Sequence, residues 1–158
     1  MAAGTYEPIV PWSPNGFTDG TVELLLKASQ TFKKGAPLVS NGGYYEEAAT
    51  SPSTVAYIAA EDAVSGASDG AETIIAWRVD PGKFYEISCE DAHAVTDYGA
   101  VWGLKKDATT GFWIADSADA GDQVVFIRPV VTPKLGVVGD TKYRALFQFQ
   151  VANIAGAA

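Results

Sequence analysis

The sequence is poor in the residues on which metal and thiol chemistry depend. It contains one cysteine, Cys89, and one histidine, His93. A single cysteine cannot form an intramolecular disulfide, and a structural zinc site needs several Cys or His ligands. If residues 89–93 formed a helix, the two side chains would lie together and could make a Cys–His nucleophile pair. A buried cysteine that acts as a small hydrophobe is the favoured alternative.

Positive charge and long apolar runs are also scarce. Eleven Lys and Arg residues stand against 19 Asp and Glu, so the formal net charge is −8. Such a chain is repelled by nucleic-acid phosphates, and we expect no nucleic-acid partner. No apolar run approaches the length of about 20 residues that spans a bilayer. Because residues 1–7 also lack the regions of a signal peptide, we expect no membrane partner and synthesis in the cytoplasm.

The motifs of common catalytic sites are missing as well. No serine lies in a Gly-x-Ser-x-Gly elbow, and segment 66–70 lacks the lysine and helix of a phosphate-binding loop. Acidic pairs such as 46–47 would be split between the two faces of a strand. The oxygen-rich loop 116–122 could hold calcium, but Ile127 stands where an EF-hand has its bidentate glutamate. These absences predict a protein that is not an enzyme and uses no cofactor or metal.

What the 158 residues do contain suits one soluble globular domain, since 47% are hydrophobic and 11% aromatic. Sixteen glycines and eight prolines divide the chain into segments too short for typical helices. The sequence therefore predicts an all-β fold. We expect a barrel or sandwich of about eight short strands, with at most one or two short helices.

Turn signals and alternating apolar residues predict where the strands pair. The clearest hairpin joins 72–79 to 83–89 through Asp80-Pro81-Gly82, and Asn41-Gly42-Gly43 predicts another. A buried strand is expected within 54–60, in competition with a helix over 53–63, and a short helix within 88–97. Further strands are expected at 21–29, 100–105, 111–115, 123–128 and 142–151.

The N-terminal segment 1–20 has a different composition. Its prolines prevent regular ladder bonds, so it predicts an extended arm, followed by a single β-rich domain over 21–152 and a flexible tail over 153–158. Aromatic residues on an arm can dock into a groove of another subunit, or they can fold back on their own core. The candidate contacts with a partner protein or another subunit are Tyr6, Pro11, Trp12, Pro14 and Phe17.

Charge is unevenly distributed along the chain. Eleven acidic residues and two basic ones lie between residues 44 and 97, whereas the remainder is about neutral. This asymmetry predicts an acidic side opposite a partner-binding side, with a purely solubilising role as the alternative.

Four segments resemble the head decoration, or capsid cement, proteins of tailed bacteriophages. Segment 32–39 contains a Gly-x-Pro-Leu stretch, and 55–62 is a strand that ends in Ala-Ala-Glu-Asp. Segment 77–87 resembles the hairpin that follows in such proteins, and 98–116 resembles a late segment of several of them. The resemblance extends over residues 20–130, and the strand expected at 142–151 has no counterpart in it.

The resemblance implies a structural virion protein without enzymatic activity. Such proteins bind the outside of the expanded icosahedral capsid, commonly as trimers, and stabilise the shell against internal DNA pressure. The implied partner is the major capsid protein, the implied assembly a homotrimer, and the implied location the exterior of the virion capsid. On a lattice of copies, a weak individual contact becomes effective through multivalency.

Two other functions stay open at this point. A carbohydrate- or host-surface-binding β-sandwich would use Trp77, Trp102 and Trp113 as a stacking platform. The strand pattern places Trp77 inside and Trp113 on an exposed face, and the platform fails if the tryptophans belong to the core. A virion connector or tail component is compatible with the same composition.

Overall fold

The computed structural model describes residues 2–16, 20–119, 121, 123–132 and 135–155. Within them the fold is all-β, as the sequence predicted, and thirteen short strands replace the expected eight. The elements are β1 (Val10–Trp12), β2 (Val22–Leu25), β3 (Thr31–Phe32), β4 (Pro37–Asn41), β5 (Tyr44–Glu47), β6 (Tyr57–Ala59), β7 (Ala63–Val64), β8 (Thr73–Arg78), β9 (Phe84–Ser88), η1 (Val95–Asp97), β10 (Val101–Lys106), β11 (Trp113–Asp116), β12 (Val124–Pro129), β13 (Arg144–Phe149) and η2 (Val151–Asn153). Among these residues, no helix has the length and apolarity that crossing a membrane requires.

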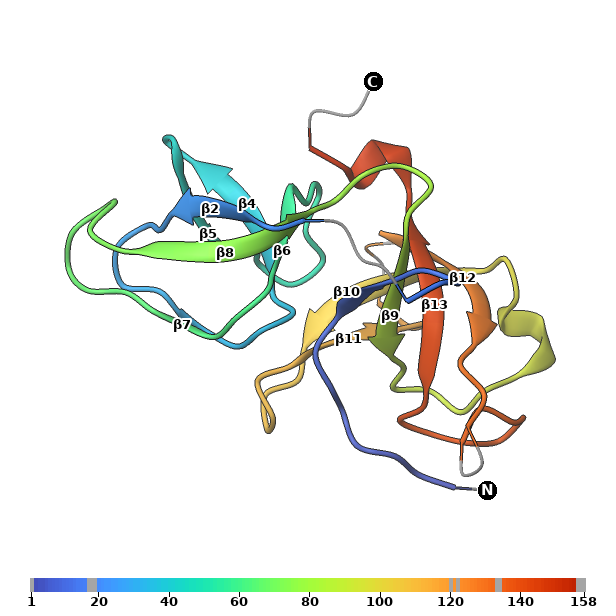
Figure 1. The fold of residues 1–158 in the computed structure, drawn as a ribbon. Coiled ribbons are helices and arrows are strands. Elements are labelled where there is room, and N and C mark those ends of the chain that lie inside the picture. Colours follow the sequence, from blue (N-terminus) through green and yellow to red (C-terminus); the bar gives the residue numbers. More distant parts are fainter. Residues whose placement is uncertain (1, 17–19, 120, 122, 133–134, 156–158) are drawn as a thin grey trace.

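The first half of the chain forms a small closed sheet. Its strands lie in the order β2-β8-β6-β4-β5, and every neighbouring pair is antiparallel. A parallel bridge between Leu26 and Tyr45 joins the two ends of this order. We call this unit the first barrel, and Figure 1 shows it in blue to green.

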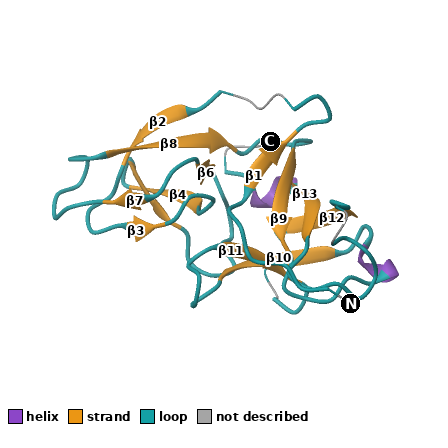
Figure 2. Ribbon diagram, turned by 60° about the horizontal axis from the view of Figure 1, so that its bottom comes forward, coloured by secondary structure: helices purple, strands orange, loops and turns teal. Residues whose placement is uncertain are grey.

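The second half forms another closed sheet. Its strands lie in the order β9-β13-β12-β10-β11, again antiparallel, and β1 is added on the outer edge of β9. A parallel bridge between Cys89 and Ala115 closes the order. This unit is the second barrel. Figures 1 and 2 both show it beside the first barrel.

The two barrels have the same topology and the same register. In each, the first strand pairs with the fifth, the fifth with the fourth, the fourth with the second and the second with the third. Individual pairs correspond as well. Glu23 lies opposite Ile75 in the first barrel, and Glu86 lies opposite Leu146 at the equivalent place in the second. The chain therefore contains a structural repeat, which the sequence analysis did not predict.

Hydrogen bonds outside the strands repeat in the same way. The Gly35 N–H donates to the Ala59 carbonyl at 2.8 Å, and the Ala59 N–H donates to the Ala36 carbonyl at 2.9 Å. In the second barrel the same two bonds, with the same lengths, join Gly99, Phe126 and Ala100. Both glycines have positive φ, which glycine adopts without strain. A Gly-Ala pair thus directly precedes the second strand of each barrel.

The predicted hairpin over residues 72–89 is wrong, although both of its strands exist. β8 belongs to the first barrel and β9 to the second, so the turn at Asp80-Pro81-Gly82 connects the two units. Each strand instead pairs with residues distant in sequence. The hairpin at Asn41-Gly42-Gly43 is confirmed, because β4 pairs directly with β5.

Both proposed helices are overruled by long-range backbone bonds. Residues 57–59 form strand β6 rather than part of a helix, because they pair with β4 and β8. Within 88–97 only η1 is helical, since Ser88 ends β9 and the His93 N–H donates to the Asp140 carbonyl. A backbone group that bonds a distant segment cannot also bond its own helix.

One hydrophobic core cluster extends through both barrels. Direct contacts join the two units: the Ser51 N–H donates to the Leu104 carbonyl at 3.1 Å, and Glu47 accepts from Trp113 and Lys106, each at 2.9 Å. The interiors differ in composition. The second barrel contains a cluster of aromatic rings in mutual contact that includes Trp102, Phe126 and Phe147, each at most 1% exposed.

Candidate interaction surface

Residues 2–4 at the N-terminus are fastened to the second barrel. The Gly4 N–H donates to the Thr141 carbonyl at 3.0 Å, and the Thr141 N–H donates to the Ala2 carbonyl at 2.9 Å. The Ala2 N–H donates to the Asp140 carboxylate at 2.8 Å. This backbone donor, with those of Val137 and Gly136, lowers the pKa of Asp140 below its usual range. The start of the chain is therefore held by ladder-like bonds.

Strand β1 corrects the prediction that residues 1–20 make no regular ladder. Val10 lies opposite Glu86, Pro11 opposite Tyr85 and Trp12 opposite Phe84. Proline is tolerated in an edge strand when its nitrogen faces away from the neighbouring strand, because no N–H is then missing from the ladder. Pro11 also leaves the outer edge of β1 without one donor, which disfavours pairing with a further strand.

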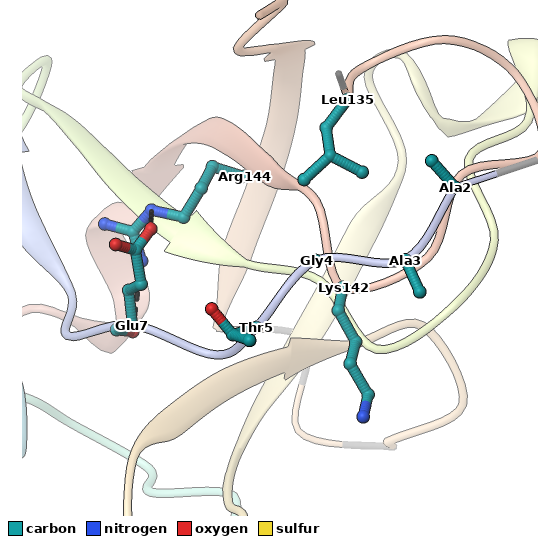
Figure 3. A pocket seen from close by; sticks show the side chains of 8 residues that line it. All are labelled: Ala2, Ala3, Gly4, Thr5, Glu7, Leu135, Lys142 and Arg144. Atoms are coloured by element: carbon teal, nitrogen blue, oxygen red, sulfur yellow. Dashed lines mark hydrogen bonds and ion pairs between the residues drawn. The ribbon is translucent and has the colours of Figure 1, made fainter.

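Arg144 on β13 anchors the segment that leads into β1. Its guanidinium donates to the carbonyls of Glu7 and Pro8, at 3.0 and 2.7 Å, and to Ser88 Oγ at 3.1 Å. It also pairs with the Glu86 carboxylate at 3.1 Å, and its side chain is 11% exposed. Figure 3 shows Arg144 reaching from β13 to Glu7. Sequence reasoning missed this residue, although an arginine at the start of an apolar strand is a usable signal.

The predicted contact residues of the N-terminal segment differ in burial and in the residues that they contact. The Trp12 ring packs edge-on against Phe84, with centroids 5.9 Å apart, and lies under the Arg128 guanidinium at 5.3 Å. Pro14 is exposed, and Phe17 lies outside the described residues. Tyr6 is half-buried beneath the Lys142 ammonium at 5.1 Å. Trp12 and Tyr6 therefore contact residues of their own chain, and docking of these aromatic residues into another subunit stays a prediction.

An open cavity of about 520 Å³ lies beside this segment. Leu135 faces the backbone of residues 2–4 across it, whereas Lys142 and Arg144 point to different sides, as Figure 3 shows. Arg144 is already occupied by the bonds described above. The cavity is lined by Ala2, Ala3, Gly4, Thr5, Glu7, Leu135, Lys142 and Arg144.

Cys89 and His93 do not form a nucleophile pair. His93 is 4% exposed, and its Nδ1 lies 3.1 Å from the Asp97 carboxylate, which also accepts the Tyr143 hydroxyl at 3.4 Å. Cys89 is fully buried in the core. Burial raises the pKa of the Cys89 thiol far above its usual value, because a thiolate is poorly solvated there. The alternative that Cys89 is a small core hydrophobe is the one that the structure supports.

We predict that Cys89 reacts with iodoacetamide at least about a hundredfold more slowly in the folded protein than in the unfolded chain at pH 8, because the reactive species is an accessible thiolate. Mass spectrometry over a time course, with and without urea, measures both rates. A similar rate in both states would contradict the burial of this thiol.

The tryptophan platform is not formed. Trp102 and Trp113 are 1% and 2% exposed, and Trp77 is half-buried with the Lys34 ammonium 5.6 Å from its ring centroid. The expectation that Trp113 faces solvent is wrong, because its side chain is buried and its indole N–H donates to Glu47 of the first barrel. The oxygens of the loop at 116–122 are partly engaged as well: Asp116 pairs with Lys105 at 3.0 Å and accepts the Ala118 N–H at 2.9 Å. In the described part of the chain, no group of three acidic, His or Cys residues is placed to hold a metal ion.

Acidic residues of segment 44–97 are spread over both barrels, and several accept backbone N–H groups. Glu61 binds the N–H of Ile75 and Asp62 that of Lys34. Part of the acidic segment thus stabilises loops and strand ends.

The predicted flexible tail is corrected at residues 153–155, where Ile154 is 5% exposed and the Ala155 N–H donates to the Val55 carbonyl at 2.9 Å. Residues 156–158 lie outside the described part.

Gly35 and Gly99 provide a matched test of how closely the N-terminal segment packs. A Cβ on Gly35 would lie 2.4 Å from the Ile9 nitrogen, whereas a Cβ on Gly99 meets nothing within 4 Å. Both residues have positive φ. We expect Gly99→Ala to lower the free energy of unfolding by about 1–2 kcal/mol, the cost of a left-handed alanine. Gly35→Ala should cost clearly more, as measured by urea denaturation, and equal losses would contradict the close approach.

Comparisons with known proteins assign no family. No protein-family model and no curated protein matches the chain. The functional argument therefore depends on the residues and geometry described above.

Proposed function

We propose that this protein is a structural virion protein that binds the outer surface of a phage capsid and stabilises the expanded head. The resemblance of its segments to capsid cement proteins suggests this role. The observation that carries the proposal is the joining of two barrels into one body by a shared core and by direct bonds between Glu47, Trp113 and Lys106. A protein that bridges neighbouring capsid subunits holds them together against internal pressure only if its own parts do not separate.

The proposal includes the major capsid protein as partner, a homotrimer as assembly and the capsid exterior as location. It assigns no catalytic role, in keeping with the burial of Cys89 and the pairing of His93 with Asp97. The net charge of −8 suits a protein that stays soluble and apart from the packaged genome. The carbohydrate-binding alternative loses its main support, because two of its three tryptophans are buried.

Rebinding to capsids tests this function. Purified protein is mixed with expanded phage heads that lack their decoration protein, and bound protein is measured by gradient sedimentation. We expect saturable binding and a higher temperature of capsid rupture in a DNA-release assay. Light scattering coupled to size-exclusion chromatography should give three times the monomer mass. Absence of both binding and thermal protection would reject the proposed function.

A further inference from the structure

The structural repeat shows that the outer edge of the first strand pairs with an added strand in the second barrel but with none, among the described residues, in the first barrel. On β9, the outer edge at residues 84–86 is covered by β1. The equivalent residues of the first barrel are 21–23, because the pairing of β2 with β8 matches that of β9 with β13 residue by residue. In the described part of the chain, β2 pairs only with β8, apart from the bridge at Leu26. We call this open position the β2 edge.

Apolar side chains around the β2 edge are exposed where their equivalents are covered. The exposed fractions are 42% for Val22, 47% for Leu25 and 39% for Ile75. Their equivalents in the second barrel are at most 1% exposed: Tyr85, Ser88 and Leu146. Part of that cover comes from the N-terminal segment, since Pro11 lies opposite Tyr85 and the Glu7 N–H donates to Ser88. The first barrel therefore exposes an apolar surface of the kind that residues 7–12 cover in the second.

Backbone groups along the β2 edge are directed outward. The Leu26 N–H donates to the carbonyl of Glu72, which directly precedes β8, so Leu26 faces β8. The Lys27 N–H donates to the carbonyl of Tyr45 on β5 and so faces the other side of the same strand. Because successive peptide groups of a strand alternate between its two edges, the N–H and C=O of Glu23 and Leu25 face away from β8. Among the described residues nothing bonds to the N–H and C=O of Glu23, whereas Leu25 adjoins the bridge between Leu26 and Tyr45. The β2 edge thus offers both ladder bonds and apolar contacts.

Charge distinguishes the two edges and indicates the occupant. Glu86 is paired with Arg144 in the second barrel. The residue equivalent to Arg144 in the first barrel is Thr73, and Glu23, equivalent to Glu86, has no ion-pair partner among the described residues. Two copies of β2 paired antiparallel about Glu23 would place like charges opposite each other, which is destabilising. A foreign strand with a basic side chain is the better complement.

We propose that the β2 edge binds an extended segment of a partner protein as an added antiparallel strand, with apolar side chains opposite Val22 and Leu25 and a basic side chain opposite Glu23. Strand addition of this kind combines main-chain hydrogen bonds with side-chain pockets. The chain provides its own template, because β1 occupies the equivalent edge in the same orientation. The inference goes beyond the capsid proposal and does not depend on it, since any partner with such a segment would satisfy it.

A peptide based on the chain's own strand is the probe. It copies residues 5–13 with lysine in place of Val10, because Val10 lies opposite Glu86 and the lysine would then lie opposite Glu23. The labelled peptide is titrated into the full-length protein by fluorescence anisotropy, and a scrambled peptide is the control. We expect saturable binding, with NMR shift changes at residues 21–25 and 75 rather than at 84–88.

Two variants at one exposed residue test backbone pairing and charge. Glu23→Pro removes both the outward N–H and the carboxylate and leaves the bonds to β8 intact, as Pro11 leaves the pairing of β1 with β9 intact. We expect it to weaken peptide binding at least about tenfold while thermal unfolding shows a folded protein. Glu23→Lys keeps the backbone donor and should reverse the preference, so that a peptide with glutamate in place of Val10 binds better than the lysine peptide.

Three outcomes would overturn the inference. The first is no binding of the lysine peptide by the wild-type protein up to about 1 mM, the range of very weak complexes. The second is equal binding by folded Glu23→Pro. The third is concentration-dependent dimerisation that Glu23→Pro abolishes, which would make a second copy of the chain the occupant of the β2 edge. Capsid rebinding is scored separately, so failure here is distinguishable from failure of the proposed function.

Discussion

Replacing Phe126 with alanine should lower the free energy of unfolding by about 4 kcal/mol, the largest loss that we expect from a single core substitution. Phe126 is fully buried, and its ring lies 5.3 Å from that of Phe147 and 5.4 Å from that of Trp102. It also stacks on His93 at 5.7 Å. Removing the ring leaves a cavity that these rigid neighbours cannot fill. Urea denaturation followed by tryptophan fluorescence measures the change.

Phe126→Leu is the matched control for this substitution. It retains most of the apolar volume, so the expected loss is less than about 2 kcal/mol. If alanine cost no more than leucine, Phe126 would not hold the aromatic cluster together. The first barrel has Ala59 at the equivalent position. The two barrels therefore share a backbone but not an interior, and the large loss is specific to the second.

Arg144→Ala should have the second-largest effect, with a loss of about 3 kcal/mol and release of the N-terminal segment. The guanidinium holds two backbone carbonyls, at Glu7 and Pro8, together with the carboxylate of Glu86. Alanine would leave these acceptors partly buried and without a donor. Limited proteolysis, followed by N-terminal sequencing, should show new cleavage before residue 13, and denaturation gives the free energy.

Arg144→Lys separates charge from geometry. Lysine restores the positive charge beside Glu86 but cannot donate to several acceptors as a planar fork does. We expect it to recover less than half of the lost stability and to leave the N-terminal segment sensitive to protease. Full protection in Arg144→Lys would show that charge alone holds the segment. Unchanged stability in Arg144→Ala would show that β1 is held by its pairing with β9.

Local signals located the strands well. The Asn41-Gly42-Gly43 turn predicted its hairpin because two residues with positive φ connect β4 and β5, and glycine supplies that conformation. Polar, turn-like separators predicted β10, β11 and β12 close to their observed bounds, and alternation of apolar and polar residues predicted β13. These features depend on residues that are near one another in the sequence.

Partner choice could not be predicted in the same way. The turn at 80–82 suits a hairpin, yet β8 and β9 pair within different barrels, because a ladder of backbone bonds accepts almost any side chain. The β2 edge could likewise not be predicted from the sequence, since it is recognised only by comparison with the edge of β9 that β1 covers. The repeat itself leaves few identical residues, with Glu23 and Glu86 among them, and its connecting loops differ in length.

The sequence alone determined that this chain is all-β, where most of its strands lie, and that its net charge is −8. Composition, alternation and turn residues act locally and need no partner. Only the tertiary structure decided that the strands form two barrels of one topology, that Trp113 is buried and that β1 covers one edge while the β2 edge stays open. The physical reason is that strand pairing and burial depend on backbone bonds and packing between residues distant in sequence.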